Sequence, residues 1–279
     1  MMTKLKHSWQ QWREWLKFLA WGLTIVLVCF LLYRIIVKGS CEQRLVPLSA
    51  EARDSLMTVG MPQGMSDTLV RYDAFDVHFN SGRGIANCAV YELVTDELNG
   101  TVERDGEFLQ DAAVKGCPVP QDYAGSGMDR GHLVPAADLK WNENAMRQSF
   151  LLTNVCPMHK ALNEGGWSKL EEKVREWTAR DSALLVFTGP IVGESDTTLA
   201  SGRVVVPSAY YKVIMAPCVR PIRVVAFIYP NGHSGGRLSQ YAVSVDEVER
   251  RTGLDFFPTL PQEEQERLES SSKLEAFTN

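Results

Sequence analysis

An uncharged run near the N-terminus restricts the fold of this chain more than any other feature. Residues 18–33 read FLAWGLTIVLVCFLLY, and the apolar character resumes through IIV after Arg34. A helix of about 20 apolar residues is long enough to cross a bilayer. Counted as 18–37, the run therefore predicts one N-terminal transmembrane helix. Arg34 lies near its end, where a long side chain can extend to the lipid headgroups.

Two other interpretations of this run are a cleaved signal peptide and a helix buried in a soluble core. The run exceeds the roughly 7–15 residues of a signal-peptide core, and a long polar segment precedes it. Lys4, Lys6, Arg13 and Lys17 precede the run, and Arg34, Lys38 and Arg44 follow it. This small excess predicts a cytoplasmic N-terminus. We therefore expect a single-pass membrane protein whose globular part lies outside the cytoplasm, on the periplasmic side of a bacterial inner membrane.

Net charge and cysteine content narrow the class of protein further. The formal net charge of −5 gives no overall basic surface of the kind that binds nucleic acid. A pure nucleic-acid-binding module is therefore disfavoured, whereas an enzyme that contacts phosphate through a metal ion and a few arginines is not. The six cysteines include no CxxC pair, so we expect no structural zinc site. Disulfides can form outside the cytoplasm, and the sequence leaves open any pairing among Cys41, Cys88, Cys117, Cys156 and Cys218.

Local composition divides the chain into five segments. Residues 1–17 form a cytoplasmic segment before the membrane helix. Residues 38–66 contain Gly, Ser, Pro and charges without periodicity, which predicts a linker. Residues 67–261 form one globular domain. Residues 262–279 are charged and serine-rich, which predicts a solvated and partly frayed tail.

The domain mixes predicted strands and helices without strict alternation. Alternating or short apolar runs predict strands within 72–80, 86–94, 183–193, 203–217 and 222–231. Apolar periodicity and capping residues predict helices at 143–150, at 167–180 and between Ser244 and Gly253. This pattern indicates an α+β fold around a largely antiparallel sheet.

A charged tetrapeptide, Asp-Arg-Gly-His, ends at His132. Histidine titrates near neutral pH and can accept a proton from water. Asn163 offers a neutral oxygen that hard cations such as magnesium accept as a ligand. Glu171 follows eight residues later, a little over two helical turns, so the two side chains face broadly the same way.

Arg130 and Arg104 add planar guanidinium groups that suit phosphate. Base, metal ligand, cation and carboxylate together indicate metal-assisted phosphodiester hydrolysis. Each residue also has an ordinary interpretation. His132 could be a core histidine, Asn163 a turn or helix cap, and Glu171 one member of a solvated charge run. Asp129 and Arg130 could form a surface ion pair of little value.

Three motifs decide between these interpretations: SGMDRGHLVPAAD, AMRQSFLLTNVCP and LNEGGWSKLE. In order and spacing they resemble the DNA/RNA non-specific endonucleases, the family that includes mitochondrial endonuclease G. The resemblance extends over residues 68–260 through VERDGEFLQD, TGPIV, VPSAYYKV, VVAFIYPN and SVDEVERRTGLDFFP. Met128 and Met158 depart from the family pattern, which commonly has an aromatic residue and a glutamine there.

The resemblance implies a ββα-metal core on a mainly antiparallel sheet flanked by helices. It implies that His132 is the general base and that Asn163 is the sole protein ligand of a magnesium ion, with manganese as an alternative. Asn154 would support the histidine side of the site, and Glu171 would hold metal-bound water or an arginine. Arg104 would stabilise charge on the phosphate.

Arg130 would lie against the substrate backbone or prop the motif. The implied activity is metal-dependent, sequence-non-specific endonuclease cleavage of DNA, RNA or both, and family members are often homodimers. The expected partners are therefore nucleic acid, membrane lipid around the N-terminal helix and a second copy of the chain. Two alternatives remain: a membrane-anchored nucleic-acid-binding module with a decayed nuclease fold, and a phosphodiesterase of the same fold.

Overall fold

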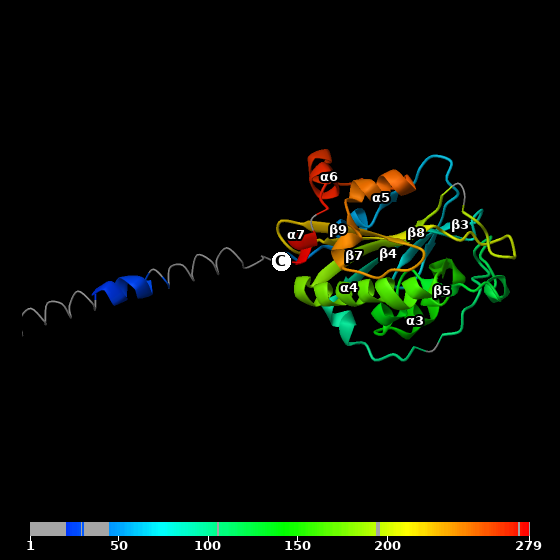
Figure 1. Cartoon of the computed structure of the whole chain (residues 1–279), viewed down its shortest axis with the longest axis horizontal. Helices are drawn as coiled ribbons and strands as arrows, with labels where there is room; N and C mark the ends of the chain where they lie inside the picture. The colour runs from blue at the N-terminus through cyan, green and yellow to red at the C-terminus, as the bar shows by residue number, and fades with distance from the viewer. Residues whose placement is uncertain are drawn as a thin grey trace, which may run out of the picture. The chain divides into compact units, whose positions relative to one another are not determined.

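Seven antiparallel strands form the central sheet of the unit that spans Leu45–Asn279 (Figure 1). The strand order is β10-β9-β8-β7-β4-β3-β2. The strands are β2 (Thr68–Arg71), β3 (Asp76–Asn80), β4 (Ile85–Val94), β7 (Ala183–Ile191), β8 (Ala209–Ala216), β9 (Arg223–Pro230) and β10 (Ala242–Val243). Every residue of β7 and β8 is buried, because both faces of the sheet are covered. Strands covered on both faces give continuous apolar runs in the sequence instead of alternation.

Two small sheets and a set of helices complete this unit. The small sheets pair β1 (Val59–Gly60) with β11 (Asp255–Phe256), and β5 (Asp129–His132) with β6 (Val155–Met158). The α-helices are α2 (Ala50–Leu56), α3 (Glu143–Ser149), α4 (Ser168–Asp181), α5 (Val245–Thr252), α6 (Gln262–Glu269) and α7 (Leu274–Thr278). Shorter helical turns are η1 (Thr95–Asn99), η2 (Pro120–Tyr123), η3 (Ala136–Leu139), η4 (Leu152–Asn154), η5 (Leu162–Trp167) and η6 (Leu238–Gln240).

Each face of the central sheet carries its own apolar core, because successive side chains of a strand point to opposite faces. On one face, Tyr210 of β8 belongs to a core with Leu170 and Val174 of α4. On the other face, the neighbouring Tyr211 belongs to a core with Val248 of α5. Helices α3 and α4 lie on one side of the sheet with β5, and α5 and α6 lie on the other (Figure 1). The mixed α+β architecture and the mainly antiparallel sheet confirm the sequence-based expectation.

Local signals account for the helices that were predicted correctly. The Ser244 side chain accepts a hydrogen bond from the Glu247 backbone N–H and so caps α5. Gly253, with a φ of 76°, ends α5 in the left-handed conformation that glycine adopts readily. The Asn142 side chain caps α3 in the same way through the Ala145 backbone N–H.

The predicted linker and tail were wrong in part. From residue 45 onward the predicted linker contains α2 and β1, and Leu56 and Val59 belong to the core beneath α5. The predicted solvated tail contains α6 and α7, which bury Leu268 and Phe277. The Phe277 ring lies 5.0 Å from the Trp177 ring of α4. A single apolar residue in a charged segment can anchor a short helix, and composition does not reveal it.

The structure describes residues 21–28, 30, 45–104, 106–193, 196–272 and 274–278. Of the unit Met1–Arg44, the described residues 21–28 and 30 are helical. The rest of the predicted transmembrane segment 18–37 lies outside the described residues. Within the described part of the chain, we find no helix that combines the length and the apolar character needed to cross a membrane.

The four cysteines of the described part are free thiols, and all are buried: Cys88, Cys117, Cys156 and Cys218. Burial raises the pKa of Cys88 to about 12 and that of Cys117 to about 11. These thiols therefore stay protonated near neutral pH and behave as small apolar side chains in the cores.

Candidate active site

The Asp-Arg-Gly-His tetrapeptide forms strand β5, which pairs antiparallel with β6. In this pairing Gly131 lies opposite Cys156, and His132 lies opposite Val155. A Cβ atom on Gly131 would lie 2.6 Å from the Cβ of Met158, closer than real contacts allow. The glycine therefore lets the two strands approach closely, and this contact fixes the backbone just before His132.

His132 is 8% exposed and lies between two aromatic rings. Its ring centroid is 5.2 Å from that of Phe108 and 4.9 Å from that of Phe150. Within the described residues, its Nε2 is buried without a hydrogen-bond partner. Burial, together with the positive charge of Arg104, lowers the pKa of His132 to about 3. The ring is therefore neutral at physiological pH, which is the protonation state that a general base requires.

Asn163 lies in η5, a π-helical turn that leads directly into α4. Its Nδ2 donates a hydrogen bond to Oδ2 of Asp129 at 2.9 Å. This bond joins the start of β5 to the start of the helix and fixes the orientation of the amide. Because the nitrogen is held by Asp129, the amide oxygen faces away from it. Among the described residues, that oxygen accepts no hydrogen bond.

The π-helical turn depends on two glycines. Gly165 has φ −109° and ψ −107°, outside the helical region. A Cβ on Gly166 would lie 2.7 Å from Cε1 of Tyr229 and 2.8 Å from Oγ of Ser234. Single π-helical turns within α-helices are frequent at functional sites. Here the turn places Asn163 beside β5.

Glu171 lies on α4 above a buried group of charged side chains. Asp138 accepts hydrogen bonds from Arg175 at 2.8 Å and from the Tyr91 hydroxyl at 2.8 Å. Burial raises the pKa of Glu171 to about 7, while the charges of Lys212, Arg175 and Arg104 oppose this rise. The carboxyl group therefore titrates near neutral pH.

Lys212, from β8, is fully buried beneath this group. Its Nζ lies 4.6 Å from the centre of the Trp167 ring and donates to the Thr188 hydroxyl at 3.3 Å. Burial lowers the pKa of Lys212 to about 8, and the negative charges of Glu171 and Asp138 act in the opposite direction. A buried ammonium group requires such charge partners, so Lys212 and Glu171 stabilise one another.

The two arginines occupy different positions. The Arg104 guanidinium lies 5.6 Å from the Phe150 ring centre and acts electrostatically on both His132 and Glu171. Arg130 instead lies against the Phe108 ring, at 5.4 Å, and donates to the Pro120 carbonyl at 3.1 Å. Two roles were expected for Arg130: contact with the substrate backbone, or structural support of the motif. These contacts favour structural support.

The Asn154 side chain is fully buried. Its Oδ1 accepts from the Val134 backbone N–H, and its Nδ2 donates to the carbonyls of Val134 and Ser149. Its own carbonyl accepts from the Leu133 backbone N–H. Asn154 therefore fixes the chain that follows His132, and these hydrogen bonds go to backbone groups instead of the imidazole.

The structure thus places Arg104 within electrostatic reach of both His132 and Glu171, and it joins Asn163 through Asp129 to the strand that ends at His132. Sequence reasoning missed the roles of Asp129, Arg175, Asp138 and Lys212. Arg175 lies four residues after Glu171 on one helix face, a spacing that could have identified it. Lys212 is a charge within an apolar strand, which signals a buried partner. Nothing local marks Asp138.

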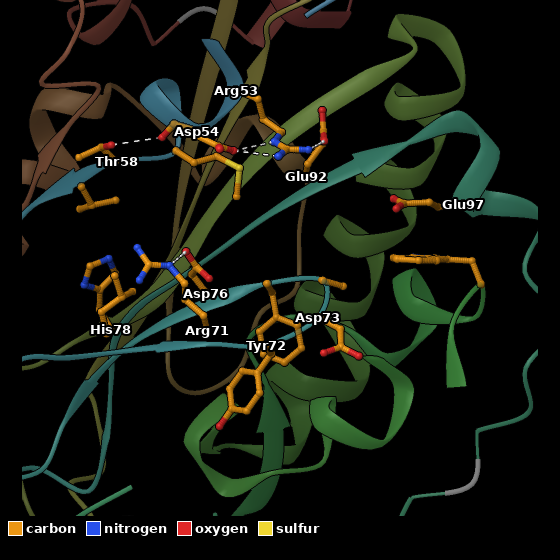
Figure 2. A pocket seen from close by; sticks show the side chains of 16 residues that line it. Arg53, Asp54, Thr58, Arg71, Tyr72, Asp73, Asp76, His78, Glu92 and Glu97 are labelled. Atoms are coloured by element: carbon orange, nitrogen blue, oxygen red, sulfur yellow. Dashed lines mark hydrogen bonds and ion pairs between the residues drawn. The ribbon is translucent and has the colours of Figure 1, made fainter. Parts of the chain in front are cut away.

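A cavity of about 550 Å³ lies elsewhere, beside β2, β3 and α2 (Figure 2). None of the six predicted site residues lines it. Its arginines are held by carboxylates: Arg53 contacts Asp54 and Glu92, and Arg71 contacts Asp76 (Figure 2). Acidic side chains outnumber the arginines along its walls. This cavity therefore does not suit a phosphate backbone.

The η5–α4 helix follows the β5–β6 ribbon in the sequence, and the hydrogen bond between Asp129 and Asn163 joins the two. Residues 53–263 match the family model for DNA/RNA non-specific endonucleases, and the chain belongs to this family.

The chain is also similar to individual nucleases. The chain is 30% identical over 220 residues to the mitochondrial nuclease EXOG of Mus musculus, covering 72% of this chain and 60% of that protein. It is 30% identical over 262 residues to a nuclease of Nostoc sp., covering 86% and 94%. A chain in the crystal structure of the EndoG/EndoGI complex superposes with a TM-score of 0.66 at 24% identity, covering 70% and 88%. The match to mouse EXOG thus spans about three-fifths of that protein's length.

Proposed function

We propose that this chain is a metal-dependent endonuclease that hydrolyses phosphodiester bonds of DNA, RNA or both without sequence preference. The observation that carries the proposal is the hydrogen bond from Asn163 to Asp129, on the strand that ends at the neutral, buried His132. This bond orients an otherwise free amide oxygen, and the same strand carries a group that can accept a proton. Contacts to phosphate and sugar do not read sequence, so low specificity is expected.

The site residues suit a hard divalent cation. Asn163 would hold magnesium, or manganese, through its free oxygen as the sole protein ligand, because oxygen ligands are those that such ions prefer. When bound, the ion would neutralise phosphate charge. His132 takes the proton of the attacking water, and Arg104 stabilises charge on the phosphate. Glu171 accepts hydrogen bonds on the helix side of the site, and Asn154 and Arg130 hold the ribbon in place.

The same proposal extends to location and assembly. The apolar run at 18–37 would anchor the chain in a membrane as a single-pass helix, contacting lipid, with the nuclease domain outside the cytoplasm. A sequence-tolerant nuclease on that side avoids the nucleic acids of its own cell. As the family resemblance implies, we also propose that the chain forms a homodimer.

Single-turnover cleavage of plasmid DNA and of RNA by the His132→Ala variant tests the function. We expect a loss of about 10²–10⁴-fold in rate, the usual contribution of a general base. Thermal melting of the variant should show that the fold persists. His78→Ala, a histidine on β3 outside the site, is the matched control and should cleave at the normal rate.

The two alternatives give different results in the same assay. A decayed binding module would bind nucleic acid with magnesium present but cleave neither substrate. A phosphodiesterase for another substrate would hydrolyse a small diester and leave plasmid DNA and RNA intact. Wild-type rates in His132→Ala would remove this histidine from the mechanism.

A further inference from the structure

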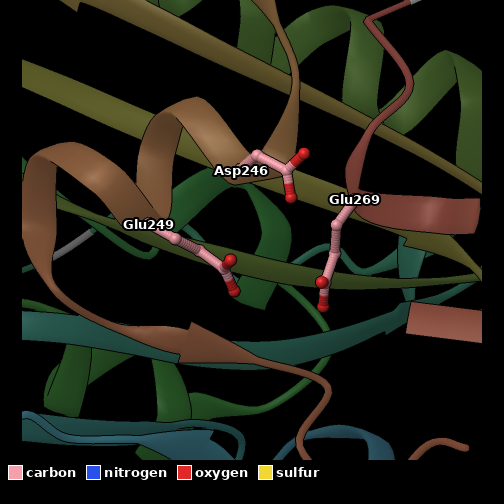
Figure 3. Close-up of side chains that lie close together, drawn as sticks. All are labelled: Asp246, Glu249 and Glu269. Atoms are coloured by element: carbon pink, nitrogen blue, oxygen red, sulfur yellow. The ribbon is translucent and has the colours of Figure 1, made fainter. Parts of the chain in front are cut away.

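Three carboxylates meet on the face of the sheet opposite the candidate active site. Asp246 and Glu249 project from α5, and Glu269 is the last residue of α6 (Figure 3). One oxygen from each side chain lies within 4.8 Å of the corresponding oxygens of the other two. The cluster therefore joins two helices that are separate in the sequence.

Glu269 is the member that ordinary helix chemistry does not explain. It is 8% exposed, and its Oε1 is buried with no hydrogen-bond partner among the described residues. Its carboxylate is directed toward those of Asp246 and Glu249 (Figure 3). A negative charge at the C-terminal end of a helix is also unfavourable, because the helix dipole is negative there.

The charged groups near this cluster make the burial of the Glu269 carboxylate still less favourable. The charged groups that influence Glu269 most are Glu249, Asp246 and Asp255, all of them acidic. The other two carboxylates have separate explanations: Asp246 lies in the first turn of α5, and Glu249 accepts from the Phe256 backbone N–H at 2.7 Å. A buried carboxylate without a partner among like charges is stabilised either by a bound proton or by a counterion.

We propose that Asp246, Glu249 and Glu269 bind a calcium ion that links α5 to α6. The ligand set indicates which cation fits. Three carboxylates whose oxygens lie within 4.8 Å of one another suit calcium, which accepts about six to eight oxygen ligands in a flexible geometry, better than magnesium, which demands a near-ideal octahedron. Water would fill the remaining positions of the flexible calcium shell.

The site lies apart from the catalytic machinery. Val245 and Val248 of α5 and Leu268 of α6 pack in the core on one face of the sheet, and α4 packs in the core on the other. The calcium site is thus independent of the proposed nuclease function. Its expected consequence is that calcium holds α6 against α5 and stabilises the fold without taking part in cleavage.

Calorimetric titration of the full chain with calcium chloride, together with thermal melting, tests the proposal. The Asn163→Ala variant serves as the parent, so that the candidate metal ligand of the active site cannot contribute. We expect one calcium ion per chain with a dissociation constant of about 10⁻⁴–10⁻³ M, as in weak sites with few ligands. Calcium should raise the melting temperature of this parent, and magnesium should bind more weakly.

Adding Glu269→Gln to this parent should weaken calcium binding about tenfold or more and remove the melting shift. In chelator, the same variant should be at least as stable as the parent, because a like charge is removed. Glu263→Gln, an exposed position on α6 outside the cluster, is the control and should bind calcium normally. Equal calcium affinity in parent and Glu269→Gln would overturn the proposal. So would no calcium binding by the parent, which would mean that the carboxylates share a proton.

Discussion

In the proposed metal site, Asp129 and Asn163 have different roles. Asn163 would supply the amide oxygen as the ligand, and Asp129 fixes the amide through the 2.9 Å hydrogen bond from Nδ2. Groups that orient a ligand commonly affect metal affinity by about 10–100-fold. The two residues therefore have separable effects on the magnesium requirement.

We expect Asp129→Ala to raise the magnesium concentration for half-maximal cleavage by about tenfold or more. Asn163→Ala should raise it further, because the ligand itself is removed. Glu164→Ala is the control, since this neighbour forms only an exposed ion pair with Lys160 at 3.4 Å. A titration of cleavage rate against magnesium measures all three. An unchanged titration curve for Asp129→Ala would contradict the orienting role.

Glu171 gives a pH dependence with a defined sign. Its pKa of about 7 means that the group is neutral below this pH and charged above it. The charged form accepts hydrogen bonds, so kcat/KM should rise as the pH increases through about 7. His132, with a pKa of about 3, stays neutral over the same range and contributes no change there.

Glu171→Gln should lower kcat/KM and flatten this rise. Glu172→Gln, the exposed neighbour on α4, should keep the wild-type profile. Rate profiles of the three proteins over the neutral pH range are the measurement. If Glu171→Gln keeps the same acid limb, another group controls it.

A site residue could be predicted from the sequence when the other residues of its group lie near it along the chain. His132, Asn163 and Glu171 lie within one 40-residue stretch, so an ordered motif identifies them together. Lys212 and Asp138 act through contacts that only the folded sheet creates. No feature of the sequence near Asp138 indicates that its hydrogen-bond partners are Tyr91 and Arg175.

Among the elements, the β5–β6 ribbon is the most sensitive to side-chain volume. We expect Gly131→Ala to destabilise the fold by roughly 1–3 kcal/mol, the usual cost of overpacking. The added methyl group would meet the Cβ of Met158 at 2.6 Å, and a Cβ atom cannot move without the backbone. Thermal or urea unfolding measures the loss of stability.

Gly232→Ala is the matched control for this variant, because a Cβ at Gly232 meets nothing within 4 Å. If Gly131→Ala unfolds at the wild-type midpoint, the ribbon must tolerate a wider spacing than the structure indicates.

Elements with local stop and start signals were predictable, and elements held by a single apolar anchor were not. Ser244 and Gly253 mark the two ends of α5 in the sequence. Helix α7 has no comparable signal, since its attachment depends on Phe277 meeting Trp177 from a distant part of the chain. The π-helical turn at Asn163 is also invisible to periodicity, although its two adjacent glycines mark an irregularity.

At the scale of the whole molecule, the proposed membrane anchor gives a topological prediction. Protease added to intact spheroplasts of an expressing bacterium should digest the nuclease domain and leave a small protected N-terminal fragment. The physical basis is the apolar run 18–37 and the excess of basic residues before it.

A cytoplasmic protein in the same spheroplasts is the control for membrane integrity and should survive. Complete protection of the nuclease domain would reverse the orientation. A soluble product that begins near Ser40 would identify the segment as a cleaved signal peptide.

The two cores share one sheet, and this arrangement has a thermodynamic consequence. Neighbouring residues of β8, such as Tyr210 and Tyr211, belong to opposite cores, so neither core can come apart while the other keeps its strands. We expect the unit to unfold in one cooperative transition. A ligand on either face would then raise the same midpoint, because each binds only the native state. Two ligands on opposite faces would each stabilise the native state, and their effects on stability would add. Neither ligand would change the affinity of the other, so the sheet would not couple the two sites.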